Sequence, residues 1–210
     1  MIATMFVVLP GRHSASPLVS DEMLNHLQIE YSEQAYRRGL AINRLLAELE
    51  GQDIKKQLME VNRFFNQFEY QEDHVHWGEK DYWATPNEFL GTQKGDCEDF
   101  VIAKYFALRK LGIPDERLYL TYVKALKQNV AHMVLSYFPT PSSIPLILDN
   151  YNPRIVNADK RKDLLPVYSF NAKSLFLSNA SAGLGKSLPT NKIKNSKWKK
   201  LLADIQKEKQ

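Results

Sequence analysis

Cysteine is almost absent from this sequence: Cys97 is the single one among 210 residues. One cysteine cannot form an intrachain disulfide, so the fold must be stabilised by packing and hydrogen bonds. The chain also lacks an apolar run of the roughly 18 residues that a membrane-spanning helix requires. The one thiol is either an inert buried side chain or a reactive group, and its neighbours must decide between the two.

A strong excess of charge is absent as well, because 28 Lys and Arg stand against 24 Asp and Glu. Much of the basic excess lies between residues 186 and 210. The rest of the chain shows no basic stripe with interleaved aromatics, so nucleic-acid binding is not expected. The basic tail is expected to be a solvated helix, with binding to an acidic surface as the alternative. At this length and 44% hydrophobic content, the chain can bury the core of one domain.

The start of the chain, residues 1–19, lacks the positive residues that open a secretory signal. An apolar run over residues 1–9 is nevertheless followed by the small residues Ser14, Ala15 and Ser16. The segment is either a truncated signal or a disordered, frayed or strand-forming start, and both interpretations stay open.

The remaining patterns predict an α+β domain over residues 20–176, with helices first and antiparallel strands after them. Residues 70–94 are expected to form a long loop that is rich in acidic and aromatic residues. Residues 177–210 are expected to form a flexible segment and an amphipathic basic helix around Trp198. The expected helices cover most of 20–70 and 97–111, and the expected strands cover 118–124, 130–138, 144–149 and 167–170.

Cys97 lies at the predicted start of a helix, directly after Gly95 and Asp96. Free backbone N–H groups and the helix dipole stabilise an anion there, which favours a reactive thiolate. A small hydrophobic side chain packed at a helix start is the alternative. An inert cysteine usually has apolar neighbours, whereas Cys97 has polar and acidic ones, so the surroundings favour a nucleophile.

A thiolate nucleophile needs an imidazole base and a group that orients it. His132 lies on an otherwise apolar predicted strand, and Asp149 ends the next strand. If the two strands pair as a hairpin, Asp149 comes beside His132 and fixes its tautomer. Each has a plainer explanation: a histidine satisfied in the core, and turn chemistry at Asp149. Their order, cysteine then histidine then aspartate, favours a papain-like or transglutaminase-like core with its nucleophile helix packed on an antiparallel sheet.

Three carboxylates, Asp96, Glu98 and Asp99, crowd the thiol. Negative charge there should raise the pKa of Cys97 and oppose the helix dipole. A capping box between Asp96 and Asp99 explains two of them but not Glu98. A Ca²⁺ ion would explain all three and cancel the repulsion, although the spacing is not that of an EF-hand loop.

The chain resembles the LapG family of bacterial transglutaminase-like cysteine proteinases from about residue 20 to residue 205. The resemblance rests on short segments, most specifically the Asp-Cys-Glu-Asp run within 95–100, and also on 82–86, 103–105, 131–135, 148–150, 164–171 and the helix that contains Trp198.

The resemblance implies a calcium-dependent periplasmic protease that cleaves a large surface adhesin near its N-terminus, at paired alanines, and so releases biofilm cells. It also implies a partner, the periplasmic domain of an inner-membrane receptor for cyclic di-GMP. By matching positions it implies the triad Cys97, His132 and Asp149. It further implies the calcium ligands Asp96, Glu98 and, more weakly, Asp99, with Trp83 lining the site.

Two alternatives remain from the sequence. A transglutaminase or amidase on the same fold would pass the thioester to an amine. A binding module that kept the fold without catalysis would leave Cys97 unreactive.

Overall fold

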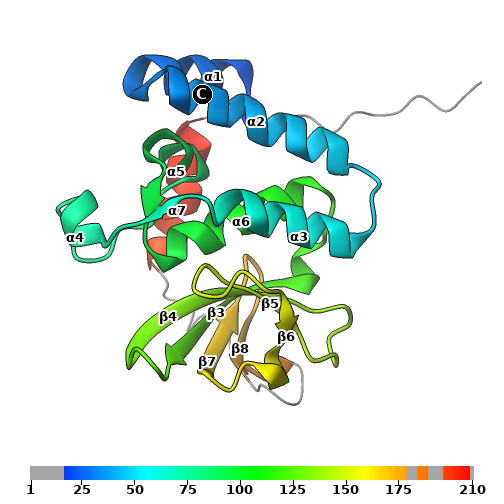
Figure 1. Ribbon diagram of the computed structural model, residues 1–210. Coiled ribbons are helices and arrows are strands. Elements are labelled where there is room, and N and C mark those ends of the chain that lie inside the picture. Colours follow the sequence, from blue (N-terminus) through cyan, green and yellow to red (C-terminus); the bar gives the residue numbers. More distant parts are fainter. Residues whose placement is uncertain (1–16, 179–183, 189–195, 209–210) are drawn as a thin grey trace, which may run out of the picture.

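The computed structural model describes residues 17–178, 184–188 and 196–208 (Figure 1). Residues 1–16, on which the two interpretations of the start depend, lie outside the described residues. None of the described helices combines the length and the apolar character needed to cross a membrane.

Helices form the first half of the described chain, and a short π-helix interrupts them. Ser20 caps the first helix, because its side chain accepts a hydrogen bond from the backbone N–H of Met23. The helical elements are α1 (Asp21–His26), η1 (Leu27–Tyr31), α2 (Glu33–Leu49), α3 (Ile54–Phe65), α4 (Asp73–His76), α5 (Pro86–Thr92), α6 (Cys97–Lys110), the 3-10 turns η2 (Asp115–Arg117) and η3 (Ala158–Lys160), and α7 (Ser196–Lys207).

Strands follow in the second half and build one antiparallel sheet, which confirms the predicted α+β class. Its seven strands run in the order β6-β5-β4-β3-β7-β8-β9. Their bounds are β3 (Leu118–Ala125), β4 (Val130–Tyr137), β5 (Leu146–Leu148), β6 (Val156–Asn157), β7 (Leu164–Phe170), β8 (Leu175–Ser178) and β9 (Leu184–Leu188), while β1 (Glu69–Tyr70) and β2 (Lys94–Gly95) pair in parallel apart from it.

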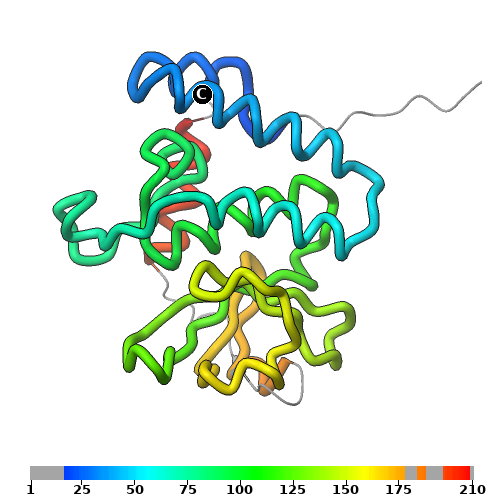
Figure 2. Tube along the Cα trace, viewed as in Figure 1, coloured from blue at the N-terminus to red at the C-terminus, as the bar shows by residue number. Residues whose placement is uncertain are grey.

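The central helix α6 lies between the other helices and the sheet, as Figures 1 and 2 show. It packs on β4 and β3 on one side and on α3 and α5 on the other. Phe100 and Ala103 are buried on one side of this helix. Val101, Ile102 and Leu108 are buried too, because the helix is covered on both sides. This packing holds the first turn of α6 against β4.

The predicted loop over 70–94 is wrong in one respect, since it contains two helices, α4 and α5. Pro86 occupies the first position of α5, where a proline is well tolerated. Thr85 and Glu88 form a reciprocal capping box at this start.

The C-terminal part differs from the prediction as well. Residues 184–188, which fall in the segment expected to be flexible, form strand β9 beside β8. The predicted amphipathic helix is present as α7, and it buries Trp198 and Leu201. Figure 2 shows this red segment beside the green middle of the chain, where Trp198 packs on Tyr105 of α6.

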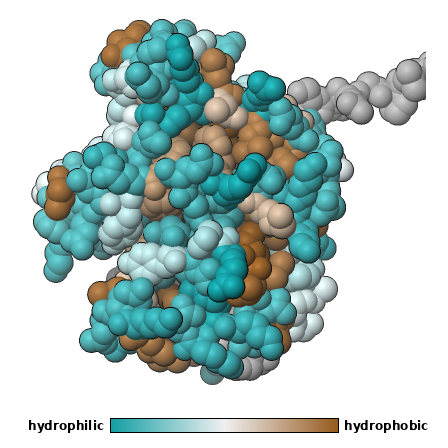
Figure 3. All heavy atoms as spheres, in the orientation of Figure 1, coloured by the Kyte–Doolittle hydropathy of each residue, from teal (hydrophilic) through white to brown (hydrophobic). Residues whose placement is uncertain are grey.

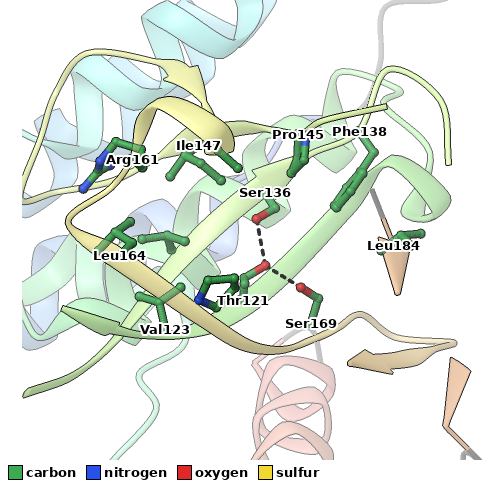
Figure 4. Close-up of a pocket in the computed structure, with 13 residues that line it drawn as sticks. Thr121, Val123, Ser136, Phe138, Pro145, Ile147, Arg161, Leu164, Ser169 and Leu184 are labelled. Atoms are coloured by element: carbon green, nitrogen blue, oxygen red, sulfur yellow. Dashed lines mark hydrogen bonds between the residues drawn. The ribbon is translucent and has the colours of Figure 1, made fainter. Parts of the chain in front are cut away.

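The sheet face opposite α6 carries a row of three buried hydroxyls (Figure 4). Thr121 Oγ1 lies 2.7 Å from Ser136 Oγ and 2.8 Å from Ser169 Oγ. They line a cavity of about 30 Å³, which has room for about one water molecule. Apolar side chains such as Val123, Val134 and Ile147 surround the hydroxyls, and the cavity is too small to admit a substrate.

Candidate active site

Cys97 is the first residue of α6, with Asp96 as its N-cap. The capping box predicted between Asp96 and Asp99 forms. Gly95 allows the close approach, because a Cβ at this position would collide with the Asp99 side chain and with the ring of Phe89. The thiol is half-buried, and its Sγ lies 2.8 Å from Glu98 Oε2.

The environment of Cys97 favours the neutral thiol. Burial raises the pKa of Cys97 well above its usual value, and the charges of Glu98 and Asp96 raise it further. A backbone hydrogen bond with Met133 acts in the opposite direction. Met133 follows His132 on β4, so this contact brings the sulfur to the strand that carries the imidazole.

His132 and Asp149 come together as the hairpin argument predicted. Strands β4 and β5 pair in antiparallel, and His132 Nε2 lies 2.8 Å from Asp149 Oδ1. Both side chains are fully buried. His132 Nδ1 is also buried, and it has no hydrogen-bond partner among the described residues. The imidazole therefore has one nitrogen engaged by a carboxylate, while the other is buried without a hydrogen-bond partner in the described part of the chain.

Asp149 is held in its ionised form by several donors. Burial by itself would raise the pKa of Asp149. Hydrogen bonds from His132, the Tyr151 backbone and Arg161 outweigh burial and hold this pKa below its ordinary value. Arg161 Nη2 lies 2.7 Å from Asp149 Oδ2, and the same guanidinium is bidentate to Asp163. An aspartate that stays charged can orient an imidazole and stabilise its cationic form.

The His132 ring is covered by Tyr151, which follows Asp149 by two residues. The two rings are parallel, with centroids 4.0 Å apart. Sequence analysis did not identify either Tyr151 or Arg161 as site residues. Arg161 lies in a Lys-Arg-Lys run that is typical of a solvated turn, so no local pattern marked it.

We expect Arg161→Leu to lower the free energy of unfolding by about 3 kcal/mol at pH 7, because it leaves the buried Asp149 carboxylate without its cation. The folded-state pKa of Asp149 lies below its unfolded value. The stability from its ionised form is therefore present above the unfolded pKa and is lost as pH falls through the folded one. The loss of unfolding free energy in Arg161→Leu should therefore become smaller below about pH 4. Urea unfolding of the wild type and of Arg161→Leu at pH 7 and pH 3 measures this loss. Lys162→Leu, at the exposed neighbouring cation, should change stability little at either pH.

The carboxylates near Cys97 belong to a larger acidic cluster. Asp73 on α4 approaches Asp96 and Asp99, and Asp73 with Asp81 approaches Glu98, with ligand atoms within 4.8 Å of one another in each group. The sequence analysis missed Asp73 and Asp81, since both fall in the segment interpreted as a loop. The density of acidic residues between 72 and 81, just before the Asp-Cys-Glu-Asp run, is the one local feature that marks them.

The cluster has the chemistry of a hard-cation site. Burial and neighbouring charges raise the pKa of Asp73 to about 6 and that of Asp96 to about 10. Asp73 Oδ1 and Asp96 Oδ1 are buried without a hydrogen-bond partner among the described residues. Oxygen atoms that are buried, close together and unpaired fit Ca²⁺, which binds six to eight oxygens.

Asp99 differs from the other carboxylates in the cluster. Its Oδ1 accepts the backbone N–H of Ala84, and its Oδ2 accepts that of Asp96. Asp99 is completely buried and holds the loop before α5 against the start of α6. Both oxygens thus have a structural role, and Asp73 is a better placed third oxygen donor than Asp99.

Trp83, which the resemblance implied would line the site, packs in the hydrophobic core. Its side chain is buried, and its ring stacks on Phe170 and meets Trp198 edge to face. The residue that follows it, Ala84, makes the contact with Asp99. Trp83 therefore packs the core behind the cluster.

An apolar groove lies between α3 and strands β5 and β6, and its lining includes neither His132 nor Asp149. Figure 3 shows hydrophobic side chains in the hollow between these elements. The groove has a volume of about 980 Å³, and Leu58, Met59 and Ile155 contribute to its wall. Asn66 also lines it, and its Nδ2 donates to the Asp149 carbonyl. The groove has room for an extended peptide.

Comparison with known proteins gives consistent results. LapG of Legionella pneumophila is 41% identical to this chain, with a TM-score of 0.75, covering 90% of this chain and 99% of that one. A calcium-bound form of the same protein is 42% identical, with a TM-score of 0.74 and coverage of 89% and 99%. An EGTA-treated form is 41% identical, with a TM-score of 0.76 and coverage of 90% and 100%. A search of curated protein sequences found no match.

The family model of the bacterial transglutaminase-like cysteine proteinases matches residues 40–163, which include Cys97, His132, Asp149 and the acidic cluster. The match covers more than half of the chain, and it agrees with the nucleophile-type helix packed on an antiparallel sheet. The chain belongs to the family of bacterial transglutaminase-like cysteine proteinases.

Proposed function

We propose that this chain is a calcium-dependent cysteine endopeptidase in which Cys97, His132 and Asp149 form the triad. The observation that carries the proposal is the buried His132 ring: Asp149 binds its Nε2, its Nδ1 has no partner among the described residues, and Met133, the next residue of β4, makes a backbone hydrogen bond with Cys97. A nucleophile, a base and an orienting carboxylate are the three groups that thiol acyl transfer requires.

In the proposed reaction His132 Nδ1 accepts the Cys97 proton, and the sulfur attacks a peptide carbonyl carbon. Asp149 stabilises the imidazolium that forms. His132 then gives the proton to the leaving amine, the C–N bond breaks, and an acyl thioester remains. Water attacks the thioester with His132 as base, which releases the carboxylic acid and restores the thiol.

The oxyanion of each tetrahedral intermediate needs backbone donors close to the sulfur. The backbone N–H of Cys97 lies in the first turn of α6, where N–H groups have no partner within the helix. The dipole of the helix adds to their effect on a negative charge. The start of α6 thus supports both the nucleophile and the developing oxyanion.

Asp73, Asp96 and Glu98 would hold the calcium ion, with Asp81 at the edge of the cluster and Asp99 keeping the loop in place. The bound ion supplies positive charge beside the thiol, where these carboxylates otherwise oppose ionisation. Glu98 Oε2 is the present partner of the Cys97 thiol. If Glu98 is engaged as a ligand, that oxygen no longer competes with His132 for the thiol proton. The calcium-bound relative supports this assignment.

The substrate that we propose is the N-terminal region of a large surface adhesin, cut at paired alanines in the periplasm to release biofilm cells. The partner that we propose is the periplasmic domain of an inner-membrane cyclic di-GMP receptor, which sequesters the protease. The resemblance to the LapG family supports both, and the apolar groove between α3 and strands β5 and β6 suits a polypeptide substrate.

The proposed function is tested by incubating the protein and Ca²⁺ with adhesin N-terminal fragments and determining product masses. Peptide hydrolysis adds one water per cleaved bond and produces new termini. A transglutaminase would instead join chains with loss of ammonia, and a binding module would leave all masses unchanged. New termini at an alanine pair support the proposal, and either of the other outcomes refutes it.

A further inference from the structure

Lys104 is a fully buried lysine in the middle of α6, and neither the proposed triad nor the acidic cluster uses it. It lies seven residues after Cys97, about two helical turns along the same side of the helix. Burial of an ammonium group is unfavourable, and here it lowers the pKa of Lys104 to about 7. A lysine at such a position needs a reason that packing does not supply.

The amine of Lys104 is directed to the Asp149 side of α6. Its Nζ donates to Asn66 Oδ1 at 2.6 Å, and it lies 5.7 Å from the centre of the Phe100 ring. The charge of Asp149 raises the pKa of Lys104 and partly offsets the effect of burial. The buried cation and the proposed triad carboxylate therefore interact.

Asn66 connects the two residues. It follows α3, and its Nδ2 donates to the backbone carbonyl of Asp149 at 2.8 Å. An asparagine amide can present either its oxygen or its nitrogen to a neighbour, but a lysine ammonium has only donors. Lys104 thus fixes the amide with its oxygen toward α6. The nitrogen is then fixed toward the carbonyl of Asp149, where an amide oxygen would be repelled.

We propose that Lys104 is a positioning residue for the Asp149 carboxylate, acting through the Asn66 amide. The proposal rests on the proposed function, since it assigns Lys104 a part in holding the aspartate that orients His132. The chain of contacts runs from the nucleophile helix through α3 to the end of β5. It therefore links the element that carries the thiol to the one that ends at the carboxylate.

The contacts that run from Lys104 through Asn66 to Asp149 are called the relay below. Lys104→Met tests this relay, because methionine fills a similar volume without a buried charge. We expect the midpoint of thermal unfolding to stay the same or rise, since replacing a buried charge by an apolar side chain is often neutral or stabilising. We expect kcat to fall about tenfold or more, the range typical of outer-shell partners, with KM nearly unchanged. The rate of Cys97 alkylation by iodoacetamide should fall in parallel. A purely structural lysine would lose stability and activity together.

Asn66→Leu removes the middle of the relay without changing the core helix, so it tests the proposal even if Lys104→Met does not fold. It should lower kcat to a similar extent, and the double variant should be no slower than the slower single variant. Tyr105→Phe is the matched control: the neighbouring buried residue of α6 loses a 2.6 Å hydrogen bond to Asp115 yet should keep kcat. A wild-type kcat in Asn66→Leu, or additive losses in the double variant, would overturn the relay.

Failure of the relay can be told apart from failure of the proposed function. If Cys97→Ala still cleaves the substrate, the triad itself is wrong. If Cys97 is required and Lys104→Met or Asn66→Leu keeps its full kcat, the triad stands and only the role of Lys104 is refuted.

Discussion

Replacement of Cys97 by alanine should reduce peptide cleavage by at least about 10⁴-fold, because the covalent pathway is lost entirely. The thiol lies at the start of α6, beside the strand that carries His132, and no second cysteine occurs in the chain to replace it. The adhesin fragment assay measures the effect, with fragment masses followed over time at saturating calcium.

Two controls separate a chemical effect from a folding effect. Cys97→Ala should unfold at nearly the wild-type temperature, since the side chain is half-buried and loses one sulfur atom. Tyr105→Phe removes a buried hydroxyl that bonds Asp115 at 2.6 Å and should leave the cleavage rate unchanged. Cleavage that persists in Cys97→Ala would disprove the assignment of the nucleophile. Because the chain has one cysteine, iodoacetamide labelling reports on that thiol alone.

Removal of calcium with EGTA should stop cleavage, and added Ca²⁺ should restore it. Without a cation, burial together with Glu98 and Asp96 holds the pKa of the Cys97 thiol well above its usual range. The pKa of Asp96 is raised to about 10, so this carboxyl is protonated at neutral pH and must lose its proton to act as a ligand. Calcium binding should therefore release protons near pH 7, and the apparent affinity should increase with pH. Titration calorimetry in buffers of different ionisation enthalpy measures both.

Asp73→Asn tests the part of the site that local sequence did not reveal. It should weaken calcium binding by on the order of tenfold or more, because a buried oxygen donor loses its charge. The matched control is Glu48→Gln, an exposed carboxylate on α2 that should leave the affinity unchanged. Cleavage that is indifferent to EGTA would rule out calcium dependence, and an unchanged affinity in Asp73→Asn would remove Asp73 from the ligand set.

The positions of Cys97, His132 and Asp149 could be predicted because each lies at the end or in the middle of an element with a clear local pattern. A helix start, an apolar strand and a strand end are features of a few neighbouring residues. The meeting of His132 and Asp149 also follows from the antiparallel pairing of β4 and β5, which a short connection favours.

The rest of the site depends on contacts between distant segments, which periodicity does not encode. Asp73 reaches the acidic cluster from α4, in a stretch with no regular apolar spacing. Arg161 enters a buried ion pair from a run of cations that is typical of solvent-exposed turns. The burial of Lys104 could not be predicted for a different reason. Lysines on helices usually extend to solvent, and Lys104 lies in the core only because α6 is covered on both sides.

The residues of the proposed triad come from two halves of the fold, which has a consequence for the chain during synthesis and folding. Cys97 is made first, and it emerges before His132 and Asp149 have been made. His132 and Asp149 follow only with the hairpin of β4 and β5, and the proposed triad can assemble only when α6 docks on the sheet. An unfinished or misfolded copy thus carries an unactivated thiol, and peptide-cleaving capacity arises only in molecules whose two halves have closed on each other.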